Sequence, residues 1–521
     1  MRKWLTLALT AGALHAASVI RGTVVEDETG HPLARATVTV QAVGEAAWTV
    51  QSTRTNANGL FEFRNLAAGA YLISAAHVGF APVEFGQKRW HAAGVPISVA
   101  DNFTTSFTIR LPHFGSITGT VLDENDVGIP EQEVAVYSNT RPPKLLERVK
   151  TDDRGWYHLM SLPPGKYLVR SMAKLYEDGG YLPTFYRDAA TVDQSRPVEV
   201  VIERQVDHVD IHAGTGRLFT LAGRVAGGQS GPTSVALSSD TGTQIATIDN
   251  YGTFSFNPAA PGQYEILAQA PDRGRGATAG YQLLTLDRDL SDLRIPMGAF
   301  PTVRFIFEDT KGQPIDPGAL QVMARRKDMG GDTQTEPLQI AFDEKPANPE
   351  NRGREIRPAG GRVTVLPGRW DVALAPTMRY WVVDCKLSGA DNADRGRADG
   401  WNEMLLAAGS QNVVKFVLSA TVSTLRGTVK SAGGDAVAGI PVFLEPYDLD
   451  PRKRLAEVRA IRTNAAGQYQ FGGLAPGVYR LLGTFDYQMP DSSEMQAASA
   501  KTVKVEEGTN TVLDLDEFVI H

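Results

Sequence analysis

Four residues that can bind a metal or transfer a proton lie close together in the middle of the chain: Asp207, His208, Asp210 and His212. Imidazole and carboxylate groups are common zinc ligands. Alternate side chains share one face of a β-strand, so His208, Asp210 and His212 would point the same way. One interpretation is a metal site. The other, which we favour, is the polar outer face of a last strand, and we therefore expect no metal.

Motifs of common catalytic sites do not occur in this sequence. It has no His-Glu-x-x-His zinc helix and no Gly-x-Ser-x-Gly nucleophile motif. The single cysteine, Cys385, lies in an apolar run where a buried structural thiol is expected rather than a nucleophile. We predict no catalytic residue, no cofactor and no enzymatic activity. An enzyme with an unrecognised site near Trp381 and Trp401 is a less favoured hypothesis.

Two groups of aromatic residues are the best binding candidates: Phe80, Phe85 and Trp90 in one, and Tyr181, Phe185 and Tyr186 in the other. Exposed rings in β-sandwich modules stack on sugars through apolar contact surrounded by polar groups. The alternative is that these rings cover an open sheet edge or join one domain to the next. We favour this second, packing interpretation.

A repeated stretch must position these residues. Four times an Asn/Asp-rich segment ends in Gly, alternating aromatic residues follow, and a second Gly comes ten residues after the first, with Tyr two residues later. The first glycines are Gly59, Gly155, Gly252 and Gly467, and the tyrosines are Tyr71, Tyr167, Tyr264 and Tyr479. The pattern predicts a tight turn, a strand with its rings on one face, a corner, and a Tyr hydroxyl bonded to the backbone. The copies share no acidic pattern, so we favour turn chemistry over calcium binding.

Each repeat opens with a strand that contains a glycine, such as Gly22, Gly119, Gly223 or Gly427. A strand glycine indicates a bulge or a close backbone approach. The gap from Gly252 to Gly467 leaves room for a further, degenerate copy that starts near Pro301 and has Trp370 in place of Tyr. A polar segment at about 325–358 is expected to be a long loop.

These features predict an all-β chain, a tandem array of about five Ig-like or transthyretin-like antiparallel β-sandwich domains. The expected segments are 1–17 (signal peptide), 18–112, 113–213, 214–298, 299–419 (divergent, with the long loop) and 420–521. Linkers of only a few residues suggest a semi-rigid string.

The order of motifs resembles the carboxypeptidase regulatory-like domain, a transthyretin-like sandwich similar to collagen-adhesin B-type repeats and starch-binding-like folds. The zinc carboxypeptidases that carry this module bind metal through His-x-x-Glu, which this chain lacks. Collagen-adhesin repeats can form Lys–Asn isopeptide bonds beside a buried acid. Lys430, Glu445 and Asn510 are the available residues, but Lys430 is expected to face water, so we expect no crosslink.

Composition and the N-terminal segment bear on the cellular compartment. Arg2, Lys3 and a short apolar run ending at Ala16-Ala17 resemble a signal peptide, with no cysteine for lipid attachment and no later stretch long enough to span a membrane. Net charge is −7 without a basic patch, which argues against nucleic acid. We expect a secreted or periplasmic bacterial monomer.

The sequence predicts a non-catalytic exported scaffold that binds or spaces partners at the cell surface or in the periplasm. Its expected partners are a polysaccharide or another surface protein. The alternative is a carbohydrate-binding protein that uses the six aromatic residues named above.

Overall fold

The protein is described here from a computed structural model. The structure describes residues 18–43, 50–90, 92–101, 103–139, 143–176, 179–226, 234–239, 242–249, 251–270, 276–327, 336–342, 360–375, 377–388, 401–447 and 458–520. These ranges hold 46 strands, one α-helix and one short 3₁₀-helix. The predicted all-β fold class is confirmed, while the predicted signal peptide, 1–17, lies outside the described residues.

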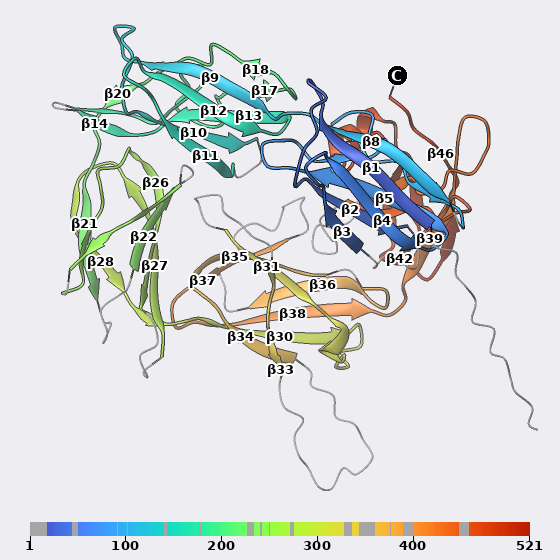
Figure 1. Ribbon diagram of the computed structural model, residues 1–521. Helices are drawn as coiled ribbons and strands as arrows, with labels where there is room; N and C mark the ends of the chain where they lie inside the picture. Colours follow the sequence, from blue (N-terminus) through green and yellow to red (C-terminus); the bar gives the residue numbers. More distant parts are fainter. Residues whose placement is uncertain are drawn as a thin grey trace, which may run out of the picture.

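The strands form pairs of facing sheets, which we call domains 1 to 5 in chain order (Figure 1). In domain 1 the first sheet has the order β4 (Leu60–Leu66), β1 (Ser18–Glu26) and β8 (Thr104–Leu111). The second sheet comprises β3 (Val50–Arg54), β2 (Thr37–Ala42), β5 (Gly69–Ala76), β6 (Val83–Glu84) and β7 (Ile97–Val99).

Domain 2 repeats this arrangement and adds a small third sheet. Its first sheet contains β12 (Trp156–Leu162), β9 (Gly115–Leu122), β18 (Gln205–Val206) and β19 (Ile211–His212). Its second contains β11 (Leu145–Lys150), β10 (Glu133–Ser138), β13 (Gly165–Ser171), β16 (Thr184–Phe185) and β17 (Val198–Val200). The small sheet is β14 (Lys174–Tyr176), β15 (Gly179–Tyr181) and β20 (Thr215–Gly216).

Domains 3 and 4 each pair a four-stranded sheet with a five-stranded sheet. Domain 3 pairs β24 (Thr247–Ile248), β25 (Thr253–Ser255), β21 (Leu221–Ala226) and β28 (Leu290–Pro296) with β23 (Gly242–Ile245), β22 (Ser234–Ser239), β26 (Gly262–Ala270), β27 (Thr278–Leu286) and β29 (Gly298–Ala299). Domain 4 pairs β33 (Ala341–Phe342), β34 (Gly360–Thr364), β30 (Thr302–Asp309), β38 (Gln411–Ser419) and β36 (Trp381–Ser388) with β32 (Glu336–Pro337), β31 (Val322–Arg326), β35 (Gly368–Leu374) and β37 (Asn402–Leu406); η1 is Pro317–Ala319.

Domain 5 returns to the simpler form and carries the α-helix. Its sheets are β42 (Gln468–Leu474), β39 (Ser423–Lys430), β45 (Asn510–Val512) and β46 (Leu515–Asp516), and β41 (Arg459–Arg462), β40 (Pro441–Pro446), β43 (Gly477–Gly483) and β44 (Lys501–Val505); α1 is Ser492–Ala497. In all five domains the first strand also pairs in parallel with a late strand, as β1 does with β8.

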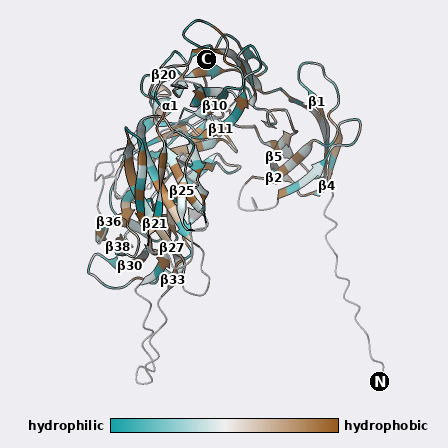
Figure 2. Ribbon diagram, turned by 90° about the vertical axis from the view of Figure 1, so that its left-hand side faces the viewer, coloured by the Kyte–Doolittle hydropathy of each residue, from teal (hydrophilic) through white to brown (hydrophobic). Residues whose placement is uncertain are grey.

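A separate hydrophobic cluster fills each sandwich. Apolar and polar residues alternate along strands such as β21 and β27, visible as brown and teal bands in Figure 2. This alternation directs one face of each strand into the core and the other towards water. Among the described residues, no helix is long and apolar enough to cross a membrane.

The repeated polar residues have the structural roles predicted for them. Asn56 Oδ1 accepts hydrogen bonds from the backbone N–H groups of Asn58 and Leu60, and Asp152, Asp249 and Asn464 do the same in their turns. Each corner Tyr donates its hydroxyl to the carbonyl four residues earlier, as Tyr71 does to Ala67 at 2.8 Å. In domain 4 Trp370 Nε1 donates to Leu366 O instead. The turn and corner predictions are confirmed.

The strand glycine marks a close backbone approach. It lies opposite an aromatic residue of the neighbouring strand in four domains: Gly22 with Phe61, Gly119 with Tyr157, Gly223 with Phe254, and Gly427 with Tyr469. A Cβ at Gly427 would lie 1.7 Å from the carbonyl oxygen of Leu513, between β45 and β46 on the parallel side. A side chain at this glycine would push the parallel neighbour away.

We expect Gly427→Ala to loosen domain 5 by about 3 kcal/mol, because the added methyl overpacks a site closed by backbone. In the full-length protein, hydrogen–deuterium exchange in β39 should rise roughly 100-fold. Gly433→Ala is the control, since a Cβ there makes only contacts of 3.6 Å or more. Equal exchange in the two variants would contradict this role for Gly427.

Candidate functional site

The aromatic insertion of domain 1 forms a loop, described over residues 84–90 and 92–96, which we call the docking segment. Glu84 N–H donates to Gln87 Oε1, and Glu84 Oε2 accepts from the Gly94 N–H at 2.6 Å. The N–H of Val95 donates to the carbonyl of Phe85 at 3.0 Å. These bonds close the loop on itself and present its far side to another domain.

The docking segment contacts domain 5. The N–H of Ala93 donates to the carbonyl of Phe485 at 2.7 Å, and Arg89 Nη2 donates to the carbonyl of Asp486 at 3.0 Å. In return, Arg462 Nη1 donates to the carbonyl of Gly94. The first and last domains therefore meet, and Figure 1 shows them side by side.

An ion pair and a cation–π contact accompany these bonds. Arg462 Nη2 lies 3.6 Å from Glu84 Oε2, and the Arg89 guanidinium lies 5.5 Å from the centre of the Tyr487 ring. Burial lowers the pKa of Arg462, and Glu84 opposes that effect. A Cβ on Gly439 would lie 2.5 Å from Pro96 Cγ, so the two backbones are in tight contact.

The array is thus closed: its short linkers predicted a semi-rigid string, and this string folds back so that its first and last domains meet. Short linkers restrict neighbouring domains, but an insertion can contact a domain hundreds of residues away. The bond from Arg89 to Asp486 spans 397 positions. The rings of the docking segment mark it as a binding candidate in the sequence, whereas the residues of domain 5 that receive it carry no such signal.

The three candidate aromatic residues of domain 1 are partly buried. Phe80 packs beside His113 with ring centres 4.1 Å apart, and Phe85 packs beside Phe107 at 4.2 Å. Trp90 and Phe85 line a cavity of about 410 Å³, together with Gln87, Lys88, Arg89 and residues of β8.

The three candidates of domain 2 also pack inward. Phe185 is 2% exposed, and the Arg170 guanidinium lies 4.6 Å from its ring centre. Tyr181 and Tyr186 pack against the main core of the domain. The structure does not bring the two aromatic groups together into one site.

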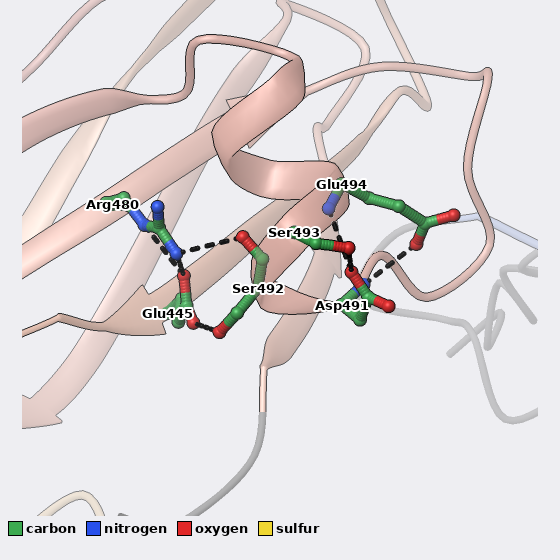
Figure 3. Close-up of polar contacts among 6 residues, drawn as sticks. All are labelled: Glu445, Arg480, Asp491, Ser492, Ser493 and Glu494. Carbon is green, nitrogen blue, oxygen red and sulfur yellow. Dashed lines mark hydrogen bonds and ion pairs between the residues drawn. The ribbon is translucent and has the colours of Figure 1, made fainter. Parts of the chain in front are cut away.

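A second cavity, of about 870 Å³, lies between domains 2 and 5. Glu147 and Lys166 line it from domain 2, and Asp491, Ser493 and Glu494 line it from α1. Asp491 and Glu494 form the capping box of that helix: Asp491 Oδ1 accepts from the Glu494 N–H, and Glu494 Oε2 accepts from the Asp491 N–H (Figure 3). Both carboxylates therefore accept hydrogen bonds that cap the N-terminus of α1.

Beneath α1, Glu445 forms a buried ion pair with Arg480. Arg480 Nε donates to Glu445 Oε2 at 2.8 Å, and Ser492 Oγ donates to Glu445 Oε1 (Figure 3). Lys430 instead lies 3.6 Å from Asp514 and is 47% exposed. The expectation that Lys430 faces water is confirmed, and the acid needed for an isopeptide bond is paired elsewhere.

Domain 4, where the less favoured hypothesis puts an enzymatic site, contains a buried cluster of ionised side chains. Asp371 is fully buried and accepts from Arg325 Nε at 2.9 Å. Glu403 accepts from Lys327 Nζ at 2.7 Å and from Arg369 Nε at 3.0 Å. Burial alone would raise the pKa of Glu403, but these two bonds hold it below the ordinary value, so the group is ionised.

The other domain 4 residues that sequence analysis named are packed. Cys385 is buried in the domain core, which confirms the prediction of a structural thiol. Trp381 donates Nε1 to the carbonyl of Thr421, and the Arg325 guanidinium lies 4.4 Å from the Trp401 ring centre. Arg325 thus contacts both the Asp371 carboxylate and the Trp401 ring.

The His/Asp cluster of domain 2 does not converge on a point. Asp207 accepts from the Thr118 hydroxyl, and Asp210 accepts from the Thr120 N–H. His212 pairs with Asp126 and Asp188 at the far end of β9. No group of three or more His, Cys, Asp or Glu residues with metal-binding geometry occurs in the described ranges.

Because Asp126 accepts a hydrogen bond from His212 and Asp188 adds to the attraction, the pKa of His212 is raised above 6.5. The pair therefore stabilises domain 2 fully below pH 6.5, and this contribution disappears as the pH rises through the raised value. NMR titration should give a His212 pKa above 6.5 that falls in Asp126→Asn. An unchanged pKa in that variant would refute the pairing.

Closure of the array predicts a specific crosslink. Residues joined by a backbone N–H···O bond have Cα atoms about as far apart as a disulfide requires. Mild oxidation of Ala93→Cys/Phe485→Cys should therefore link domains 1 and 5 within one chain, seen as a tryptic peptide containing both. Ala93→Cys/Lys504→Cys, with one cysteine in β44, is the matched control. Equal yields, or none in either protein, would contradict closure.

Comparison with known proteins supports the motif-based resemblance. No curated protein among those compared matches the chain. Similar solved structures include the Bacillus anthracis TIE protein (15% identity, 54% of this chain, 50% of that chain, TM-score 0.18). They also include the minor pilin GBS52 of Streptococcus agalactiae (14% identity, 37% of this chain, 94% of that chain, TM-score 0.25). A third is 3-chlorocatechol 1,2-dioxygenase of Rhodococcus opacus 1CP (18% identity, 18% of this chain, 59% of that chain, TM-score 0.15).

This chain spans half the length of the TIE protein, and TM-scores this low carry no argument about function. The comparison with family models is more specific than these structural matches, because it assigns a single domain, domain 1, to a family model. Residues 19–112 match the model of the carboxypeptidase regulatory-like domain, the module that the repeated motif resembles.

Proposed function

We propose that the protein is a non-catalytic scaffold that holds five β-sandwiches in a closed arrangement at the cell surface or in the periplasm. It would act as a monomer and present the outer faces of its domains to a polysaccharide or another surface protein. The supporting observation is that the residues shared by the repeats form hydrogen bonds that hold the turns and corners of each domain.

That role is consistent from copy to copy. Asn or Asp closes each turn, and each corner Tyr bonds a backbone carbonyl. A buried Thr also bridges two backbone segments in three domains: Thr55 accepts from the Ala36 N–H and donates to Leu33 O, and Thr151 and Thr463 do likewise. Residues repeated for such reasons mark a structural module.

The scaffold proposal predicts saturable binding to envelope material without turnover. Purified full-length protein would be incubated with bacterial envelope polysaccharides and surface proteins, with heat-unfolded protein as the control. Binding by the folded protein and unchanged mass of the bound material are expected. Chemical conversion of the material that disappears in Glu403→Gln would overturn the proposal in favour of an enzyme in domain 4.

Carbohydrate binding by the domain 1 cavity is the second candidate, because Phe85 and Trp90 line it beside polar groups. Trp90→Ala should then weaken polysaccharide binding by tenfold or more, measured by calorimetry at unchanged melting temperature. Phe103→Ala, which removes a 50% exposed ring of the same domain, is the control. Equal affinity in the two variants would remove this candidate.

A further inference from the structure

Domain 2 carries an exposed tryptophan on the outer face of its first sheet. Of the tryptophans in the described ranges, Trp156 is the exposed one, with 45% of its surface accessible. Alternation along β12 directs Tyr157 into the core at 1% exposed and leaves Trp156, His158 and Met160 on the outer face. Met160 is 56% exposed, and His158 between the two is half-buried, so the two ends of this row face solvent in the closed array.

The other repeats show that the fold does not require this ring. The residue after the turn glycine is Trp156 in domain 2, and Leu60, Thr253 and Gln468 in its three counterparts. Two positions on, His158 corresponds to Glu62, Ser255 and Gln470. The aromatic residue common to all four copies is the inward-facing one that follows, so the outward Trp156 has another role.

Polar groups border the exposed row. On β9, Thr120 lies opposite Trp156 and Thr118 lies opposite His158. Beyond β9, Asp207 accepts from the Thr118 hydroxyl at 2.8 Å and from Gln205 at 2.6 Å. The ring centres of Trp156 and His158 are 5.6 Å apart. One sheet face thus carries a ring, an imidazole, a hydroxyl and a carboxylate side by side.

The size and charge of this face select the ligand class. From Trp156 to Met160 the row is roughly 13 Å long, and with the neighbouring strand β9 it covers on the order of 100 Å². That area is far smaller than the ~800 Å² that each partner buries in a stable protein interface. A sugar ring presents an apolar C–H face to an indole and hydroxyls to neighbouring polar groups. Asp207, whose carboxylate is bonded to the Thr118 hydroxyl of this face, would repel an acidic chain. A neutral polysaccharide fits both conditions.

We propose that Trp156, with His158 and Met160, forms a binding platform for a neutral polysaccharide on domain 2. This gives carbohydrate binding a site independent of the domain 1 cavity. The platform proposal also goes beyond the scaffold role, because a scaffold could bind a protein instead of a polysaccharide.

The test uses the full-length protein with soluble starch, xylan and a neutral β-glucan, and alginate as the acidic polysaccharide. We expect at least one neutral polysaccharide to bind and to change tryptophan fluorescence. Trp156→Ala should lower that affinity tenfold or more at unchanged melting temperature, and Trp156→Tyr should retain most of it. Leu60→Ala, the equivalent position of domain 1, should bind as the wild type does.

Three outcomes would overturn the platform. They are wild-type affinity in Trp156→Ala, loss of binding in Trp90→Ala but not in Trp156→Ala, and binding of alginate alone. Failure of all four polysaccharides would also remove it. If envelope protein still bound the chain in that case, the scaffold role would stand, so the two proposals can fail separately.

Discussion

The close approach of three strands around one glycine is the constraint on which four of the five sandwiches depend. Gly22 and its counterparts leave space for an aromatic ring on one side and for the carbonyl of a parallel strand on the other. In domains 2 and 5 the ring is a Tyr whose hydroxyl bonds that carbonyl, as Tyr469 does to Leu513 at 2.6 Å. In domain 4 the pair is exchanged, since Phe305 of the first strand lies opposite Gly361 of β34.

Closure of the array adds a second level of order. The docking segment joins domain 1 to domain 5 through backbone hydrogen bonds and the pair of Arg462 with Glu84. Because these contacts are mostly polar, they hold two finished domains together without merging their cores. A closed arrangement fixes which sheet faces point outward, and the face that bears Trp156 remains exposed in it.

Local features of this protein could be predicted from sequence, whereas long-range ones could not. A turn such as Asn56 to Gly59 and a corner such as Tyr71 bonded to Ala67 depend on residues a few positions apart, so their motifs are readable. The parallel pairing of β1 with β8 and the contact of Ala93 with Phe485 depend on partners about 80 and 400 positions away. The domain 4 copy was predicted as a degenerate one, and there Phe305 stands where the other copies have the strand glycine.

For the candidate sites, sequence indicated which residues were unusual and the structure indicated where they lie. Phe85 and Trp90 drew attention as rings, and their segment is the one that docks on domain 5. Trp156 drew none, because it stands within the repeated motif and only its exposure distinguishes it. Burial of a side chain depends on the whole fold, so a motif alone cannot supply it.

Small-angle X-ray scattering of the full-length protein tests the closed array of five sandwiches most directly. The account predicts the scattering profile calculated from the closed arrangement, and an increase in radius of gyration when Arg89→Ala and Arg462→Ala are combined. An elongated wild-type profile, with a radius of gyration that the double variant does not change, would contradict it.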